Sequence, residues 1–227
     1  MQPSTTKRYT LLGLFIAFAL GPIIITGYAL SYPGMLTNWI VASRELLLLL
    51  AAATLILLIV KGEKRGLDSV GLHNRHWGKS LLLSLFILVT SSLVAFGCLL
   101  LLNAVGVSYG QGGEANRYND ISLWVITLMV MRAGFVEEFF YRGYIMERLA
   151  ELTGRWIVYF LLPAVIFGLL HFRQGLGGVL IAFVLGLVFA VFYWKYRDLK
   201  AVIIAHFLVD FIPNVLLPLF QMAPHTP

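Results

Sequence analysis

Three short patterns of acidic, basic and histidine residues lie in the second half of the chain. They are Glu137-Glu138 with Arg142, Phe167 with His171, and His206 with Asp210. Carboxylates and imidazoles are the side chains that most often move protons in enzymes, and a carboxylate can take a proton from a water that attacks a substrate. The residue types therefore point to acid–base chemistry, provided that the fold brings the three patterns together.

The first pattern separates two neighbouring carboxylates. On a helix Glu138 and Arg142 share one face at i, i+4 and can neutralise each other. Glu137 lies about 100° round the helix from Glu138 and is left for another partner. An ion network that only fastens helices together explains Glu138 and Arg142 as well as catalysis does, but it explains Glu137 less well.

The other two patterns supply histidines. His206 and Asp210 are again spaced i, i+4, so they face one way on a helix. A single intramembrane histidine is more often a hydrogen-bonded packing residue than a catalyst. Two histidines on separate helices, together with several carboxylates, favour a common site.

Composition places these residues in a membrane. The chain has 227 residues, of which 59% are hydrophobic and only 12% charged, too apolar for one soluble core. Crossing a bilayer takes roughly 20 apolar residues, and stretches of this length recur along the chain. We expect an all-α, polytopic transmembrane bundle, one domain over residues 1–227, with about seven spans. They are Tyr9–Leu30, Trp39–Val60, Ser80–Val105, Leu123–Met146, Trp156–Phe172, Val179–Tyr196 and Leu199–Phe220.

Basic residues predict the orientation, because cytoplasmic loops hold the excess of Lys and Arg. With the N-terminus inside, only Arg117 and Arg173 among the loop residues fall outside. The cytoplasmic set is Lys7, Arg8, Lys61, Lys64, Arg65, Arg75, Lys79, Arg148, Arg155, Lys195, Arg197 and Lys200. We expect a multi-pass protein of the cell membrane with a cytoplasmic N-terminus and the lipid bilayer as its partner. The net charge of +6 is spread over short loops, which argues against a nucleic-acid partner.

Two further features fit no single interpretation. Arg44 and Glu45 lie inside the second span, where they either pair locally at a helix break or extend a polar interior. The Gly-rich segment Gly106–Asp120 is a loop, more simply a connector than a flap.

The patterns EExxxR, FxxxH and HxxxD, in this order on successive late spans, resemble those of the CAAX protease and bacteriocin-processing (Abi) family of intramembrane endopeptidases. The resemblance covers about Leu123 to Ile212. It implies a bundle with an internal polar cavity in which Glu137 and His171 activate a water. It assigns His206 and Asp210 to the oxyanion, with Glu138, Arg142 and Phe167 in support.

Side-chain chemistry agrees with these roles and modifies one. An imidazole can donate to an oxyanion in a low-dielectric cavity, as His206 would. An ionised Asp210 can only accept hydrogen bonds, so we expect it to orient His206 instead. We favour a glutamate mechanism without a metal, with zinc as the alternative, because the usual HExxH spacing is absent.

Two other functions stay open at this point. A proton-coupled carrier would use the same groups as an ion relay, although its sites usually lie between two related halves. A non-catalytic immunity or scaffold protein would keep the fold alone. For a peptidase, the expected partner is a peptide or protein at the membrane: a prenylated CAAX terminus, a peptide precursor or a membrane-anchored protein.

Overall fold

The computed structural model describes residues 3–32, 36–73, 77–109, 118 and 120–222, and this part contains helices and no strand. The expected all-α class is confirmed for these residues. The α-helices are α1 (Pro3–Phe15), α2 (Gly21–Ser31), α3 (Asn38–Leu57), α4 (Trp77–Ala104), α5 (Leu123–Arg132), α6 (Glu147–Thr153), α7 (Leu162–Leu169), α8 (Gly175–Tyr196), α9 (Leu199–Phe211) and α10 (Leu217–Met222). Wider π-helical turns at Ile16–Leu20, Leu58–Gly62, Ala133–Glu137, Phe139–Met146, Ile157–Leu161 and Ile212–Leu216 continue several of them, and 3-10 turns lie at Leu67–Val70 and Phe172–Gln174.

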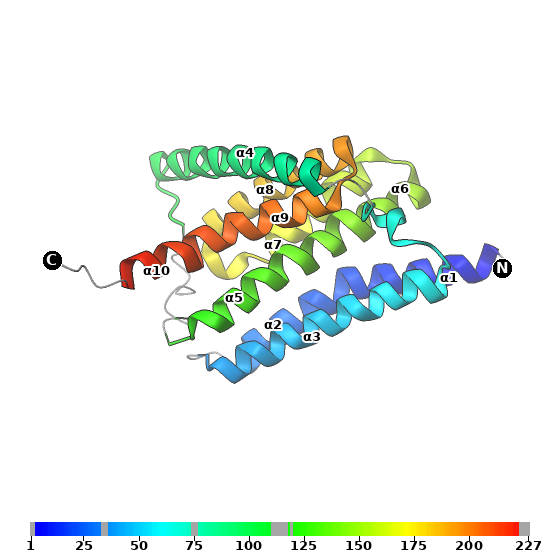
Figure 1. Cartoon of the computed structure of the whole chain (residues 1–227), viewed down its shortest axis with the longest axis horizontal. Coiled ribbons are helices and arrows are strands. Elements are labelled where there is room, and N and C mark those ends of the chain that lie inside the picture. The colour runs from blue at the N-terminus through cyan, green and yellow to red at the C-terminus, as the bar shows by residue number, and fades with distance from the viewer. Residues whose placement is uncertain (1–2, 33–35, 74–76, 110–117, 119, 223–227) are drawn as a thin grey trace.

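The helices run side by side in one bundle (Figure 1). Helices α1 to α3 form one side and α4 forms the opposite side, with α5, α7, α8 and α9 between them. Helix α3 packs on α5, whereas α4 packs on α8 and α9. The segment from α5 to α9, which carries the three polar patterns, is therefore covered from both sides.

Five helices in the described ranges are long and apolar enough to cross a membrane. They are Lys7–Tyr28, Asn38–Gly62, Trp77–Ala104, Phe172–Tyr196 and Leu199–Phe220. These agree within a few residues with five of the expected spans, except that the helix expected to start at Val179 begins earlier. The prediction of seven spans is confirmed only in this coarser form.

The remaining two expected spans differ for separate reasons. Leu123–Thr153 is one continuous helix, but it carries four charged residues in its middle and is not uniformly apolar. The next helix covers only Ile157–Leu169, about 20 Å at 1.5 Å per residue and short of the roughly 30 Å of hydrocarbon. It ends before His171, which the sequence placed inside the fifth span.

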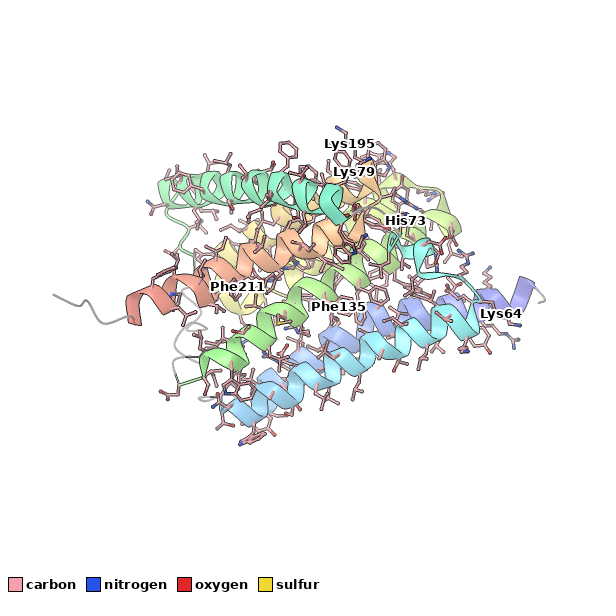
Figure 2. All side chains as sticks on the ribbon, in the orientation of Figure 1. Lys64, His73, Lys79, Phe135, Lys195 and Phe211 are labelled. Carbon is pink, nitrogen blue, oxygen red and sulfur yellow. The ribbon has the colours of Figure 1, made fainter. Side chains whose placement is uncertain are left out.

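Basic side chains gather towards the end of the bundle at which α1 begins. Figure 2 shows Lys64 in the connection after Leu58–Gly62, Lys79 on α4 and Lys195 on α8 there. A buried ion pair lies near this end too, with Arg148 Nη2 2.7 Å from Glu63 Oε2 and both side chains fully buried. The loop Gly106–Asp120 is only partly described, since residues 110–117 and 119 lie outside the described residues, so its expected role stays a prediction.

Helix α9 lies close to the backbone of the helix Leu123–Thr153 at Gly134. A β-carbon built on Gly134 would lie 3.0 Å from backbone atoms of Phe207, whereas one on Gly97 of α4 meets no atom within 4 Å. Backbone cannot yield as a flexible side chain can. Gly134 therefore allows the contact that places the neighbouring His206 beside Glu138.

We expect Gly134→Ala to destabilise the fold by about 1–3 kcal/mol, because the added methyl group overpacks this contact. Gly97→Ala is the matched control and should be neutral or slightly stabilising, because alanine favours a helix over glycine by about 0.5–1 kcal/mol. Thermal unfolding of both variants in the same detergent measures the difference. Equal stability of the two variants would contradict the close contact.

Candidate active site

The long helix Leu123–Thr153 presents its charged residues in two directions. Its centre is π-helical at Ala133–Glu137 and Phe139–Met146, with Glu138 between the two stretches. In a π-helix the hydrogen bonds join residues five apart, so such residues come closer to one face than they do in an α-helix. Widened turns of this kind are frequent at functional sites.

Glu138 belongs to a buried cluster that joins three helices. Arg142 Nη1 donates to Glu138 Oε1 over 2.6 Å, which confirms the i, i+4 pair. His206 Nδ1 of α9 lies 2.7 Å from the same oxygen, and Arg142 Nη2 donates to the Gly186 carbonyl of α8 over 2.9 Å. The side chains of Glu138, Arg142 and His206 are 0%, 1% and 7% exposed. Glu138 thus contacts α9 directly and α8 through Arg142, and its own side chain is fully buried.

His206 lies between two carboxylates. Besides Glu138, it faces Asp210, whose Oδ2 lies 3.4 Å from His206 Nε2 and whose side chain is 35% exposed. Because an ionised carboxylate only accepts hydrogen bonds, the Nδ1 next to Glu138 carries a proton. The sequence predicted Asp210 as the group that orients His206, but the shorter contact comes from Glu138.

The Phe167 ring packs against residues of all three patterns. The Arg142 guanidinium carbon lies 4.7 Å from its centroid, and the rings of His171 and His206 lie at 4.9 Å and 6.0 Å. Tyr141 meets it edge-on at 5.6 Å. Phe167 thus contacts Arg142 and both histidines, and the supporting role that the resemblance implies for it stays a prediction.

His171 follows α7 and is fixed by its own backbone. Its Nδ1 lies 2.8 Å from the Phe167 carbonyl oxygen. A carbonyl oxygen cannot donate, so Nδ1 is the protonated nitrogen, and a neutral ring leaves Nε2 as an acceptor. His171 can therefore receive a hydrogen bond from water or take a proton at Nε2.

Glu137 is paired with a partner other than Arg142, as the sequence predicted, and that partner is Arg132. Arg132 Nη1 of the same helix donates to Glu137 Oε1 over 2.6 Å. On an ideal α-helix residues five apart are about 140° apart, and the π-helical turn between them removes this separation. Arg132 also donates through Nε to Glu45 of α3.

Glu45 in turn accepts from Arg44 Nε over 2.7 Å. Helix α3 continues through both residues from Asn38 to Leu57. The helix-break interpretation of Arg44 and Glu45 is therefore wrong. They pair locally and extend the polar interior towards Glu137.

Two adjoining pockets reach Glu137 and His171. The smaller has a volume of about 100 Å³ and mainly apolar walls that include Gly21 and Leu48. The larger, of about 450 Å³, also borders Arg44, Asp210 and Asn214. Of the four residues expected to be catalytic, Glu137, His171 and Asp210 line the larger pocket, whereas His206 lines neither pocket and faces Asp210 through Nε2.

Zinc is the cofactor left open by the sequence. Across residues 3–32, 36–73, 77–109, 118 and 120–222, no three His, Cys, Asp or Glu side chains form a group that could hold a metal ion. One oxygen of each neighbouring carboxylate already holds a cation or a histidine: Glu138 Oε1 contacts both Arg142 and His206, and Glu137 Oε1 accepts from Arg132. Glu138 Oε2 has no hydrogen-bond partner within the described part of the chain but is fully buried. The residues present do not fit a zinc site, and we derive no step through a metal.

Two participants were not assigned to the site from the sequence, namely Arg132 and Glu45. Their charge inside apolar spans could have indicated a role, because an ionisable residue in a membrane has a high free-energy cost. Their pairing could not be predicted from the sequence, since Glu45 and Arg132 are separated by 87 positions.

A comparison with protein-family models finds a match over the segment that carries the three polar patterns. Residues 119–212 match the family model described as type II CAAX prenyl endopeptidase Rce1-like. This confirms the resemblance to the CAAX protease and bacteriocin-processing family, and the matched segment nearly coincides with the predicted core of 123–212. No curated protein and no solved structure matches the chain significantly.

We expect Arg142→Met to destabilise the fold by about 3–5 kcal/mol, because it leaves the Glu138 carboxylate buried without its cation. The double variant Arg142→Met with Glu138→Gln should recover most of this loss, since it removes the charge as well. Unfolding of wild type, single and double variants in detergent gives the coupling energy. A double variant as unstable as the sum of the single variants would show that the pair is not coupled.

Proposed function

We propose that this chain, whose residues 119–212 match the Rce1-like family, is an intramembrane endopeptidase that hydrolyses a peptide bond with a glutamate-activated water. The observation that carries the proposal is the position of Glu137. It lies with His171 on a pocket wall at 19% exposure, whereas Glu138 beside it is fully buried in an ion pair. The family name is that of an endopeptidase, so the proposal extends that activity to this chain.

In the proposed reaction, Glu137 takes a proton from a water while the water oxygen attacks the carbonyl carbon of the peptide bond. His171 accepts a hydrogen bond at Nε2 from the other O–H of this water and so orients it, and that hydrogen stays on the attacking oxygen. The carbonyl oxygen becomes an oxyanion in a tetrahedral intermediate. When the C–N bond breaks, protonated Glu137 returns the proton to the leaving amine, which restores the carboxylate.

We assign oxyanion stabilisation to His206, with Asp210 beside it. The Nε2 side of the His206 ring is directed to Asp210 across 3.4 Å, longer than an ordinary hydrogen bond. This loose contact can be exchanged for a substrate oxyanion. In the imidazolium form of His206 both ring nitrogens carry a proton, so that Nδ1 stays on Glu138 while Nε2 donates to the oxyanion without a turn of the ring.

The pockets support a peptide substrate presented from the membrane. The smaller one is the size of an aliphatic side chain and lies between α2, α3 and the residues of the site. The larger one has polar and aromatic walls and accommodates the backbone beside it. We propose that together they form the internal polar cavity. Prenylated CAAX termini, peptide precursors and membrane-anchored proteins are the candidate substrates.

The placement in the membrane is part of the proposal. The five apolar helices and the family match support an integral membrane protein. We further propose a cell-membrane location with a cytoplasmic N-terminus and seven spans. The two additional crossings would be the helix Leu123–Thr153 and the short helix Ile157–Leu169, both within the bundle. The excess of basic residues in alternate loops supports this orientation.

Glu137→Gln should reduce cleavage at least about 100-fold, because the amide keeps the shape but cannot accept the proton of water. The protein, purified in detergent, is incubated with membrane-tethered and C-terminally prenylated peptides, and products are identified by mass spectrometry. Glu151→Gln is the matched control, because Glu151 lies on the same long helix with a 43% exposed side chain paired to Arg65. The control should cleave as the wild type does.

Cleavage that persists in Glu137→Gln would contradict the glutamate mechanism. Absence of cleavage by the wild type across the whole panel, with intact folding, would instead favour the carrier or the scaffold function. Proton uptake in vesicles then distinguishes those two.

Asp210→Asn should keep most of the activity, within about tenfold of the wild type. The amide oxygen can still accept a hydrogen bond from His206, and the amide nitrogen can donate to an oxyanion. Steady-state rates of Asp210→Asn and Asp210→Ala on the same peptide measure this. A loss in Asp210→Asn as large as in Asp210→Ala would show that the negative charge itself is required.

A further inference from the structure

A row of four alternating charges leads from α3 to the pocket. Arg44 Nε donates to Glu45 Oε1 over 2.7 Å, and Arg132 donates through Nε to the other oxygen of Glu45. Arg132 Nη1 then donates to Glu137 Oε1 over 2.6 Å. Glu45 lies outside residues 119–212, the segment that carries the family match.

Burial shows which members of the row can meet a substrate. The Glu45 side chain is 0% exposed and borders neither pocket. Arg132, at 6% exposure, borders both pockets together with Glu137, and Arg44 borders the larger one. Glu45 therefore acts on the site through the residues that it pairs, and on Glu137 through Arg132.

The shape of Arg132 connects the two carboxylates. A guanidinium is planar and its N–H groups have fixed directions. When Nε is held by Glu45, the direction of Nη1 towards Glu137 follows. The single positive charge of Arg132 is also divided between two anions.

We propose that Glu45 is a positioning residue for Glu137, because by sharing Arg132 it fixes the direction of the Glu137 carboxylate and limits how strongly Arg132 holds it ionised. The inference rests on the proposed role of Glu137 as the general base. It extends the site to α3, a helix that carries none of the three sequence patterns.

A base of intermediate strength is what the reaction needs. A carboxylate given the whole charge of an arginine is readily ionised but takes a proton from water poorly, whereas one without a cation stays protonated. When Arg132 is shared between Glu45 and Glu137, Glu137 receives only part of its charge and is a base of strength between these two extremes.

Several other groups lie around Glu137 and act on it equally in all variants. Tyr141 and Arg142 come from its own helix, and both interact electrostatically with Glu137. His171 and Arg173 border the pocket from the connection between α7 and α8, and Asp210 borders it from α9. The experiment leaves all of these groups in place and changes only Glu45 and Arg132.

The two substitutions should shift the pH dependence in opposite directions. Glu137 acts in its ionised form, so activity rises with pH as it loses its proton. Arg132→Gln removes the cation that favours ionisation, and the acidic limb of the rate profile should move to higher pH by about 1–3 units. Glu45→Gln removes a nearby anion and leaves Arg132 to Glu137 alone, so the limb should move to lower pH.

The experiment measures cleavage rates against pH for wild type, Glu45→Gln and Arg132→Gln in detergent. In parallel, infrared difference spectroscopy follows the protonated carboxyl band of Glu137, identified by its loss in Glu137→Gln. Glu63→Gln is the control matched for burial, because Glu63 is also a fully buried partner of an arginine, Arg148. It should lower stability without moving either titration.

Opposite shifts in Glu45→Gln and Arg132→Gln, absent in Glu63→Gln, would support the proposal. Shifts in one common direction, or no shift in either variant, would overturn it and reduce the row to a structural clamp. Because the infrared band does not depend on turnover, opposite band shifts without any peptide cleavage would refute the peptidase and keep the positioning role. Glu137-dependent cleavage with unshifted profiles would do the reverse.

Discussion

An ionised side chain inside an apolar bundle has to meet an opposite charge, and in this chain the pairing of Glu138 with Arg142 is the contact on which the site depends. Arg142 reaches the backbone of Gly186 on α8, and Glu138 reaches His206 on α9. Separation of these helices would leave the ion pair intact within its own helix but would remove its hydrogen bonds to Gly186 and His206, and a buried polar group without a partner is costly. These two contacts of the buried pair therefore help to fix the relative positions of the motifs.

This pairing gives two adjacent glutamates different properties. Glu138 is enclosed by its partners, whereas Glu137 is directed to a pocket wall with His171. The widened helical turns between residues 133 and 146 contribute to the difference, since they bring Arg132 within reach of Glu137. A regular α-helix would leave that arginine on another face.

The first three helices contribute more than a lipid-facing cover. Residues of α2 and α3, among them Gly21 and Leu48, form walls of the smaller pocket, and Glu45 joins the charged row behind Glu137. The family match does not extend to these helices. In this chain, the surroundings of Glu137 are thus shared between the matched segment and residues that precede it.

The sequence by itself determined the helical membrane class, the three motifs and the pairing of Glu138 with Arg142, because hydropathy and i, i+4 spacing are local properties of the chain. It did not determine how many helices are long and apolar enough to cross a membrane, since a helix packed inside a bundle can be short or can carry charged residues. Only the tertiary structure decided that His206 is held by Glu138 and that Glu45 reaches Arg132. Those contacts depend on how the helices pack and on a π-helical turn, and neither has a period that can be read along the chain.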